Sequence, residues 1–581
     1  MSDKKTTNVA RNDESKPSIS RRRFLRGAVT AGVGGAAALN ALGAGEVQAQ
    51  EIRWDDEVDV IVIGAGASGL PACIAARDAG AEVLVVEHHF DIGGIAIMSG
   101  GAIAFGGGNR MQLEAGQKDS PDMRFASLTH PLNQRFADAN LVRRYCDEMV
   151  ATFDFLEANG VNFDRHGTNV PSEYETGVFS ATQVRPHEWP VRVSVVSHDQ
   201  GRNGSGIVRP LELSARDKGV EFLLSHTLTD IYREQPFSGR VTGVRVEEVD
   251  RWFQSTRRAL NIRARMGVII CSGGHGHNVA FRTMFDPRLT EEYQWHGQNT
   301  APANAVPSIA AMKIGAALGT TGNETQSGTG GGVDKGRWGV RDNYVRGAQT
   351  PESATFFRHR ATGLVASWTD CILVKENGRR FWDETDDSDD GYFAHALQPT
   401  GVPGKLLGGG PVWAIFDHDA VQRKKYGTGY PDVDRAGGYF FSGETLEELA
   451  SQLIHNFYQL RPMPGNVLRE TVERFNRFVD TGTDEDFKRK DLPYKIQTPP
   501  FYAAWATPVL HDSYTGLRVN SNCQVVDLAG RAIPGLYCAG ESAGGIKQHG
   551  LGRCIVTGRV AGMECVRAAA STPERPGSKP K

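Results

Sequence analysis

Residues 57–87, EVDVIVIGAGASGLPACIAARDAGAEVLVVE, contain the pattern that decides the fold. Val58–Ile63 is a short apolar run, typical of a strand that is buried on both faces. A glycine-rich turn follows, then a helix from about Ser68 to Ala79, and then a second strand at Glu82–Val86. The stretch is therefore predicted to fold as strand, tight turn, helix and strand.

The glycine-rich turn has the spacing G-x-G-x-x-G. Gly64 permits the tight turn, Gly66 lets backbone approach a pyrophosphate, and Gly69 lets the helix pack close to the strand. The free N–H groups at the start of the helix point toward the phosphates. Glu87 lies 18 residues after Gly69, where an acidic side chain can hold the hydroxyl pair of a ribose. The stretch is therefore predicted to bind a dinucleotide.

The composition is that of a soluble globular protein with more than one domain. The chain has 581 residues, which is too long for one ordinary core, and 40% of them are hydrophobic. The net charge of −3 gives no basic signature for nucleic acid. The 8 cysteines form no C-x-x-C pair, which argues against a zinc ribbon, a cysteine-ligated cluster of the usual spacing and covalent haem. We expect most of them to be small buried side chains.

Residues 1–49 are expected to be an export signal. Arg21 and Arg22 lie in a stretch that resembles the twin-arginine motif, and Gly27–Gly45 is only mildly apolar. Small residues precede Gln50, which is expected to begin the mature chain. No other stretch has 18 uninterrupted apolar residues, so we expect no membrane span. The protein is thus expected in the periplasm or another extracytoplasmic space, exported in the folded state.

A second glycine-rich stretch, FDIGGIAIMSGGAIAFGGG, follows from Phe90. Glycines let backbone pass close to a flat ligand. Together with residues 57–87, this stretch resembles the flavoprotein family of soluble fumarate reductases, succinate dehydrogenase flavoprotein subunits and 3-ketosteroid dehydrogenases. Three later segments are similar to the family's returning strand, hinge and C-terminal FAD segment: VIICSGGHGHN (268–278), PPFYAAWATPVLHDSYTGLRVN (499–520) and IPGLYCAGESAGGIKQHGLGRCIVTGRVAG (533–562).

The resemblance implies an α/β fold. A Rossmann-like FAD-binding domain, split in the sequence, is expected over residues 50–323 and 506–568. An inserted α+β capping domain that closes over the flavin is expected over 324–505, and a disordered tail over 569–581. Periodicity predicts helices over 135–160, 206–218 and 445–459, a helix end at 311–318, and strands over 221–231 and 239–248. The acidic run DETDDSDD (383–390) is interpreted as a solvated face.

The resemblance also implies which residues hold FAD. Glu541 falls at the ribityl-binding position, and Leu228 falls where the family contacts adenine through its backbone. Residues 92–99 contain no His of the kind that attaches FAD covalently in succinate dehydrogenases, so non-covalent FAD is expected. No metal site is expected. The complete set is Gly64, Gly66, Ala67, Ser68, Gly69, Glu87, Gly93, Gly94, Gly100, Gly101, Leu228, Gly274, Gly540, Glu541, Leu551 and Ile555.

The cationic residues with which fumarate reductases hold a dicarboxylate are missing from their places. These places read here as Ser327-Gly328, Asp386 to Ser388, and His549-Gly550. Each charge-assisted hydrogen bond contributes roughly 1.5–3 kcal/mol. Losing two would therefore cost about 3–6 kcal/mol of dicarboxylate binding, or on the order of a hundredfold to ten-thousandfold in affinity. We expect fumarate and succinate to be poor substrates.

By resemblance, four residues are candidates for catalytic roles beside the flavin. Tyr514 and His511 lie in the hinge loop, and His549 lies on the loop that faces the flavin. Arg553 can hold an anion or the electron-rich edge of the flavin. For each of them a structural hydrogen bond or a solvated side chain fits the sequence equally well.

Aromatic residues near the hinge, Trp505, Tyr514 and Phe501, are expected to line a pocket for a ring-bearing or enone substrate. Under the alternative interpretation, other arginines rebuild the dicarboxylate clamp, namely Arg379, Arg380 or Arg553.

Three activities fit the sequence. FAD transfers a hydride or single electrons. The favoured activity is an oxidoreductase that reduces or introduces an activated C–C double bond in a small organic substrate (an enone, an unsaturated acid or a steroid). The direction is open, because reduction and desaturation share one site. The chain has no haem motif and no second strand-linked G-x-G-x-x-G, so an external cytochrome or quinone is expected as electron carrier. The alternatives are an electron-transfer subunit that needs a partner protein and an oxidase that uses oxygen.

Overall fold

The computed structural model places most of the chain after Glu51. It describes residues 52–99, 101–130, 137–169, 178–181, 204–250, 253–276, 278–290, 292–295, 303–319, 368–385, 395–398, 410–429, 433, 435, 438–455, 458–507, 509–510, 512–548 and 550–571. The chain divides into two compact units, Met1–Arg53 and Trp54–Lys581. The expected export signal lies outside the described residues, and all that follows concerns the second unit.

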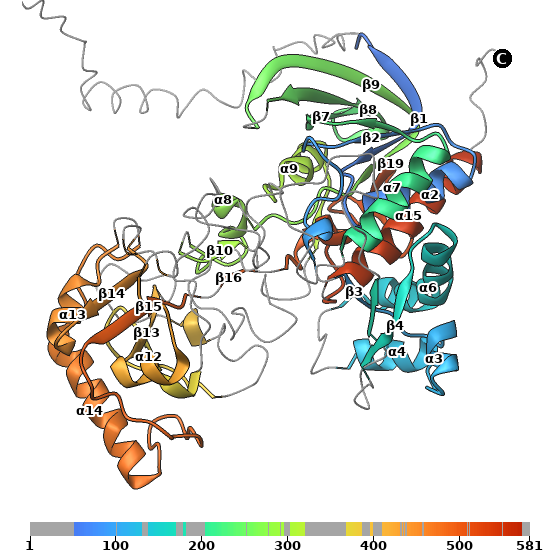
Figure 1. Cartoon of the computed structure of the whole chain (residues 1–581). Helices are drawn as coiled ribbons and strands as arrows, with labels where there is room; N and C mark the ends of the chain where they lie inside the picture. The colour runs from blue at the N-terminus through green and yellow to red at the C-terminus, as the bar shows by residue number, and fades with distance from the viewer. Residues whose placement is uncertain are drawn as a thin grey trace, which may run out of the picture. The chain divides into compact units, whose positions relative to one another are not determined.

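An eight-stranded sheet forms around β1 (Asp56–Ile63), the strand that precedes the glycine-rich turn (Figure 1). Its path is β18-β19-β9-β1-β2-β6, and β7 and β8 extend it from β9. β1 runs parallel to both β2 and β9, and β9 runs parallel to β19. The other strands are β2 (Val83–Val86), β6 (Glu221–Leu223), β7 (His226–Gln235), β8 (Ser238–Val249), β9 (Ser255–Ile270), β18 (Gln524–Val526) and β19 (Ala532–Cys538).

Three helices, α2 (Gly69–Asp78), α7 (Ser205–Asp217) and α15 (Leu551–Ala570), lie beside this sheet (Figure 1). Glycines let α15 approach α2 closely. A Cβ on Gly558 would lie 2.1 Å from the backbone oxygen of Ser68, and one on Gly562 would lie 2.2 Å from that of Ala72. The last helix of the chain therefore packs directly on the helix that follows the first turn.

Apart from the 20-residue helix α6, the next described elements are short. Asp138 caps α6 (Ala139–Ala158), as its side chain accepts from the N–H groups of Asn140 and Leu141. The other elements are η1 (Ala96–Met98), β3 (Ala102–Ala104), α3 (Arg110–Glu114), α4 (Pro121–Leu128), β4 (Phe163–Asn169), β5 (Val178–Ala181), α8 (Val279–Arg282), β10 (Gln294–Trp295), α9 (Val306–Lys313), β11 (Leu318–Gly319), β16 (Val509–Leu510), β17 (Gly516–Leu517) and η5 (Gly540–Ser542).

Two predicted elements differ from the structure: one strand is divided in two, and one helix ends earlier. The single strand predicted over 221–231 is two strands, β6 and β7, because Ser225 takes a left-handed φ of 57° between them. The helix predicted to end at 311–318 is α9, which stops at Lys313 before Gly315, where φ is +101°. Leu318 then pairs with Leu517 in β17. The predictions of helices over 135–160 and 206–218 are confirmed by α6 and α7.

A second sheet of four antiparallel strands has the order β12-β13-β15-β14. Two hydrophobic clusters pack on it, and Trp413 and Trp505 meet edge to face in one of them, with ring centroids 5.3 Å apart. The strands are β12 (Ile372–Lys375), β13 (Val412–Phe416), β14 (Phe440–Gly443) and β15 (Phe501–Trp505). The helical elements are η4 (Trp368–Asp370), α12 (His418–Lys424), α13 (Leu446–Gln452) and α14 (Gly465–Thr481).

Two expectations for this second sheet are wrong. Trp505 does not line a pocket, because its side chain is 2% exposed in the hydrophobic core, against which Phe501 also packs. The helix predicted over 445–459 ends at Gln452 as α13. The chain then turns, and the Gln459 side chain accepts from Trp413 Nε1 at 2.8 Å and donates to the carbonyl of Leu453 at 2.7 Å.

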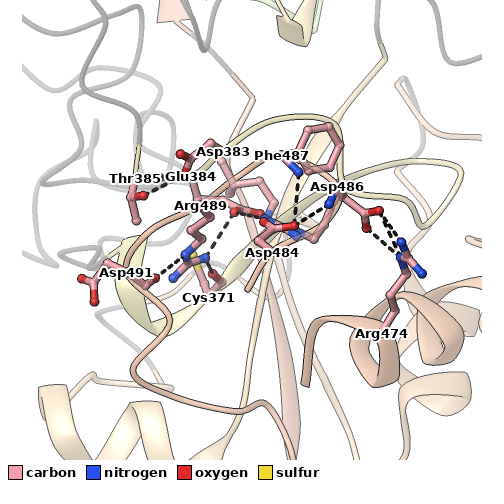
Figure 2. A network of polar contacts seen from close by, with 12 residues as sticks. Cys371, Asp383, Glu384, Thr385, Arg474, Asp484, Asp486, Phe487, Arg489 and Asp491 are labelled. Carbon is pink, nitrogen blue, oxygen red and sulfur yellow. Dashed lines mark hydrogen bonds and ion pairs between the residues drawn. The ribbon is translucent and has the colours of Figure 1, made fainter. Parts of the chain in front are cut away.

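The acidic run is not wholly a solvated face, because Glu384 is fully buried in an ionic network (Figure 2). Its carboxylate accepts from Arg380 at 2.7 and 2.9 Å, from Arg489 Nη1 at 3.2 Å and from the Leu373 N–H at 3.0 Å. Arg380 also pairs with Asp484 at 2.9 Å. Although burial alone would raise it, these partners hold the pKa of the Glu384 carboxyl below its usual value. Residues 386–390 lie outside the described residues.

Candidate functional site

Two glycines of the first turn are required by packing. The chain leaves β1 at Gly64 with φ of +100°, and a Cβ there would lie 2.5 Å from the carbonyl oxygen of Cys271. A Cβ on Gly69 would lie 1.8 Å from the carbonyl oxygen of Gly64. No side chain can be placed at either position without moving backbone, so both glycines fix the start of α2 against the ends of β1 and β9.

Two other glycines border open space. A Cβ on Gly66 would meet nothing nearer than the carbonyl oxygen of Gly93 at 3.8 Å, and one on Gly94 would meet only the Gly66 Cα at 4.0 Å. The Gly93 N–H donates to the carbonyl of Ala65 at 3.1 Å and so holds the two glycine stretches together. The space lies beside the N-terminus of α2, where N–H groups favour an anion. The backbone at these two glycines is therefore open to close approach by a phosphate group.

An ionic cluster anchors the second glycine stretch to α7. The Asp91 carboxylate accepts two hydrogen bonds from Arg209, at 2.7 and 3.1 Å, and Arg209 also pairs with Glu212 at 2.7 Å. The three side chains are at most 3% exposed. Sequence reasoning missed this anchor, because 118 residues separate Asp91 from Arg209.

Glu87 directly follows the strand β2, as the dinucleotide motif requires. Its carboxylate accepts from the N–H of Ala65 at 2.7 Å and from the N–H of His89 at 2.8 Å. Each oxygen has a further lone pair that can accept from a ribose hydroxyl. Burial raises the pKa of the Glu87 carboxyl. Leu228 is buried on β7, where it pairs with Val246.

A second part of the site joins the end of β9 to η5. A Cβ on Gly274 would lie 2.3 Å from Ser513 Oγ and 2.9 Å from Glu541 Oε2, so only glycine fits there. The Ser513 hydroxyl accepts from the N–H of His275 at 3.1 Å. Gly540 has φ of +68°. Three segments that are far apart in the sequence thus meet around the Glu541 carboxyl.

Arg553 on α15 ties these segments together. Its guanidinium donates to the carbonyls of Ile546 at 3.0 Å and Ser513 at 3.1 Å, and it lies 3.8 Å from Glu541 Oε1. It also lies over the ring of Tyr514, 5.4 Å from the centroid. The structure therefore brings together three predicted site residues, Tyr514, Glu541 and Arg553, and the Arg553 side chain is buried.

Asp512 is a member of this cluster that sequence reasoning missed. Tyr514 Oη donates to Asp512 Oδ2 at 3.2 Å. Burial and the neighbouring Asp512 raise the pKa of Glu541 well above its usual range. Burial likewise raises the pKa of the Tyr514 phenol. Asp512 lies in the sequence between His511 and Tyr514, which are both predicted catalytic candidates, and this position was the signal that could have identified it.

The remaining predicted site residues lie at the starts of α2 and α15, directly before β3, or outside the described residues. Ser68 is the buried residue before α2, with Ala67 partly buried beside it, and Leu551 and Ile555 are buried at the start of α15. Gly101 has φ of +72°. Gly100, His511 and His549 lie outside the described residues, as do Gly328 and Ser388.

Two of the three arginines that were considered for a rebuilt clamp are committed elsewhere. Arg380 is held by Glu384 and Asp484, and Arg553 donates to backbone carbonyls, whereas Arg379 is exposed. All 8 cysteines are free thiols, of which 7 are buried as predicted and Cys554 is partly exposed. The part of the chain that the structure describes contains no cluster of His, Cys, Asp or Glu placed to hold a metal ion.

Comparison with known proteins agrees with this geometry. The acrylate reductase flavoprotein subunit of Shewanella woodyi is 27% identical over 568 residues, which cover 95% of this chain and 100% of that protein. The 3-oxosteroid 1-dehydrogenase of Mycolicibacterium smegmatis is 25% identical, over 89% and 98%. The open conformation of a flavocytochrome c3 fumarate reductase superposes with a TM-score of 0.61 at 21% identity, over 96% of this chain and 83% of that chain.

The α/β flavoprotein fold that the resemblance implies is thus confirmed. The family model described as FAD binding domain matches residues 59–553, which is most of the chain. The chain therefore belongs to the FAD binding domain family and is an oxidoreductase, with relatives that include reductases and dehydrogenases acting on CH–CH bonds.

Proposed function

We propose that this protein is an exported FAD-dependent oxidoreductase that reduces or introduces an activated C–C double bond in a small organic substrate other than fumarate. One observation carries the proposal. Gly66 and Gly94 border open space beside the N-terminus of α2, whereas the Arg380 and Arg553 side chains are hydrogen-bonded to groups inside the protein. Dicarboxylate binding requires cationic donors that replace the water lost by two charges. A neutral or singly charged substrate has no such requirement.

The residues of the chain have separate roles in this proposal. FAD, when bound, supplies the transfer of a hydride. Gly66 and Gly94 would leave space for its pyrophosphate, Glu87 would accept from the ribose, and Glu541 would hold the ribityl chain. We infer that residues 324–505 form the capping domain and that residues 50–323 and 506–568 form the FAD-binding domain.

Electron exchange with a separate carrier, a cytochrome or a quinone, is part of the proposal. Support comes from the names of the relatives, since one is a flavoprotein subunit and another structure is a flavocytochrome. No helix among the described residues is long and apolar enough to cross a membrane. A carrier-dependent subunit without its own substrate chemistry is the second candidate.

The experiment that tests the proposal is anaerobic reoxidation of the reduced protein. Unsaturated acids, cyclic enones and 3-oxosteroids are mixed in turn with protein whose flavin has been reduced, and the return of the flavin absorbance is followed. A neutral or singly charged acceptor is expected to reoxidise the flavin many times faster than fumarate. If only a cytochrome or quinone reoxidises it, the chain is the electron-transfer subunit of the second candidate.

Non-covalent attachment of FAD is expected, because residues 92–99 provide no His for a covalent bond. Precipitation of the holoprotein with acid should leave the yellow colour in the supernatant. Colour that remains with the protein pellet contradicts the expectation.

Export by the twin-arginine pathway has its own test. Changing Arg21 and Arg22 together to Lys should leave FAD-loaded protein in the cytoplasm, because that pathway reads the arginine pair. The wild-type protein fractionated in parallel is the control, and equal export of the double variant refutes the assignment.

A further inference from the structure

One buried arginine differs from the others in its partners. Arg124 on α4 is 5% exposed, and in the described part of the chain its side chain makes one hydrogen bond, from Nη2 to Gln548 Oε1 at 3.4 Å. Its Nε–H is buried and has no acceptor there. A buried charge is costly unless it is paired and hydrogen-bonded, so this guanidinium has donors available for an anion. The other five buried arginines of the described chain donate to carboxylates or backbone carbonyls, namely Arg209, Arg282, Arg380, Arg489 and Arg553.

A second unpartnered donor lies at the start of α15. Tyr145 on α6 is 1% exposed, and its hydroxyl has no hydrogen-bond partner among the described residues. That hydroxyl lies beside the first turn of α15, because a Cβ added at Gly552 would lie 3.1 Å from Tyr145 Oη. The first N–H groups of a helix have no acceptor within the helix, and no side chain of the described chain caps this end at Gly550. The phenol and the helix N-terminus therefore offer hydrogen-bond donors at one place.

Packing brings Arg124 to the same place. Gln548, which accepts from Arg124, lies two residues before Gly550, the N-cap residue of α15. The helix α4 packs on α6, and α6 packs on α15. Burial raises the pKa of the Tyr145 phenol, and the charges of Arg124 and Arg553 oppose that rise, which agrees with both cations lying near the phenol. Arg124, Tyr145 and the first turn of α15 thus form one group, which we call the α15 anion site.

The chemistry of the α15 anion site selects its ligand. A guanidinium only donates hydrogen bonds, a neutral phenol donates one, and the helix N-terminus offers N–H groups and a partial positive charge. Such a set favours a negatively charged acceptor, and a carboxylate can accept from a guanidinium and a hydroxyl at once. The site is adjacent to the cluster of Tyr514, Glu541 and Arg553, because Arg553 directly follows Gly552 in α15.

We propose that Arg124, Tyr145 and the first turn of α15 bind the carboxylate of the substrate, and that the substrate is an α,β-unsaturated monocarboxylic acid. This substrate class rests on the proposed function, which supplies the reduction of an activated C–C double bond. One guanidinium balances one negative charge, so a monocarboxylate fits the α15 anion site and the second carboxylate of fumarate has no counterpart in it.

The test compares unsaturated acids with their amides, which have nearly the same shape and no charge. Acrylate, crotonate and cinnamate are each assayed beside the corresponding amide, with FAD-loaded protein and a reduced viologen as electron donor. Wild type is expected to have a KM about tenfold to a hundredfold lower for at least one of these acids than for its amide, because a charge-assisted hydrogen bond is lost with the charge.

Two variants assign the effect to the α15 anion site. Arg124→Gln should raise the KM of the acid by about the same factor and leave the KM of the amide and kcat nearly unchanged. Tyr145→Phe keeps the ring and removes one neutral donor, so it should raise the KM of the acid by about twofold to tenfold. Arg110→Gln, at an arginine whose side chain is 46% exposed, is the matched control and should keep the wild-type values.

Three outcomes overturn the proposal. The first is a wild-type KM that is equal for acid and amide, as a buried water between Arg124 and Tyr145 would give. The second is an Arg124→Gln protein that is weakened equally toward both, as a purely structural role would require. The third is a loss of FAD from both folded variants, which would assign the site to the cofactor. If Arg124→Gln does not fold, Tyr145→Phe and the wild-type comparison decide.

A binding measurement separates this proposal from the proposed function. If neither the acids nor the amides are reduced, the proposed function fails, whereas the α15 anion site is still tested by its ligand. Propanoate and 3-phenylpropanoate are titrated into the oxidised holoprotein, and binding is followed by the change in flavin absorbance. At least one of them should bind wild type, and about tenfold to a hundredfold more weakly Arg124→Gln. Equal binding by the two proteins, or none by wild type, overturns the proposal.

Discussion

Gly66→Val is expected to give a folded protein that carries no FAD. The wild-type structure has open space where the new Cβ would lie, with Gly93 as the nearest contact at 3.8 Å. The valine methyl groups would occupy the space of the pyrophosphate. Loss of two charge-assisted hydrogen bonds at roughly 1.5–3 kcal/mol each would weaken FAD by about a hundredfold to ten-thousandfold. The measurement is flavin absorbance per protein after purification, with circular dichroism as the check on folding.

Two further glycine variants sharpen this prediction. Gly429→Val adds the same side chain at an exposed position that has open space, and it should leave FAD loading unchanged. Gly69→Ala places a Cβ 1.8 Å from the carbonyl oxygen of Gly64, so it should reduce the yield of folded protein itself. Gly66→Val protein with a normal flavin content would show that the pyrophosphate lies elsewhere.

Glu384→Gln is expected to destabilise the four-stranded sheet and its helices by about 3–5 kcal/mol, the typical cost of breaking a buried ion pair. The substitution preserves volume but removes the charge that Arg380 and Arg489 share, and their side chains are 3% and 0% exposed (Figure 2). Arg380 then keeps its ion pair with Asp484, whereas Arg489 keeps its hydrogen bonds to backbone carbonyls. Urea unfolding followed by tryptophan fluorescence measures the loss, because Trp413 and Trp505 lie in this core.

Glu473→Gln is the matched control, since Glu473 pairs with Arg469 on the surface of α14 and its side chain is 52% exposed. Its effect on the free energy of unfolding should stay below about 1 kcal/mol.

The pKa of Glu384 is lowered in the folded protein. Its contribution to stability is therefore present above the ordinary carboxyl pKa and is lost as the pH falls through the folded value. The gap between wild type and Glu384→Gln should therefore narrow in acid. A loss as small as that of Glu473→Gln at neutral pH would contradict the ionic account of the network.

Much of the fold was predictable because its signals are local. The strand, glycine turn and acid of residues 57–87 lie within one short stretch, and each glycine has a separate steric reason. The ends of α9 and α13 were not predictable in this way. They depend on pairing with distant residues, such as Leu318 with Leu517 and Gln459 with Trp413.

The candidate site was predicted residue by residue but not as a network. Tyr514, Glu541 and Arg553 were identified singly, whereas their contacts through Asp512 and Ser513 arise only from folding. The prediction of a solvated face over residues 383–390 was wrong at Glu384 for the same reason, because the contacts that bury this residue arise only from folding. Glu384 lies in an acidic stretch of the kind that is usually exposed, and its partner Arg489 lies 105 residues later in the chain.

Steady-state turnover with a reduced viologen as electron donor tests the central claim most directly, because one assay compares fumarate with a neutral enone on the same FAD-loaded protein. The account predicts turnover with the enone, or with another acceptor that is not a dicarboxylate, and at most a small fraction of that rate with fumarate. Fumarate turnover equal to that of a dedicated fumarate reductase would contradict the claim that the dicarboxylate-binding half of the family's site is missing here.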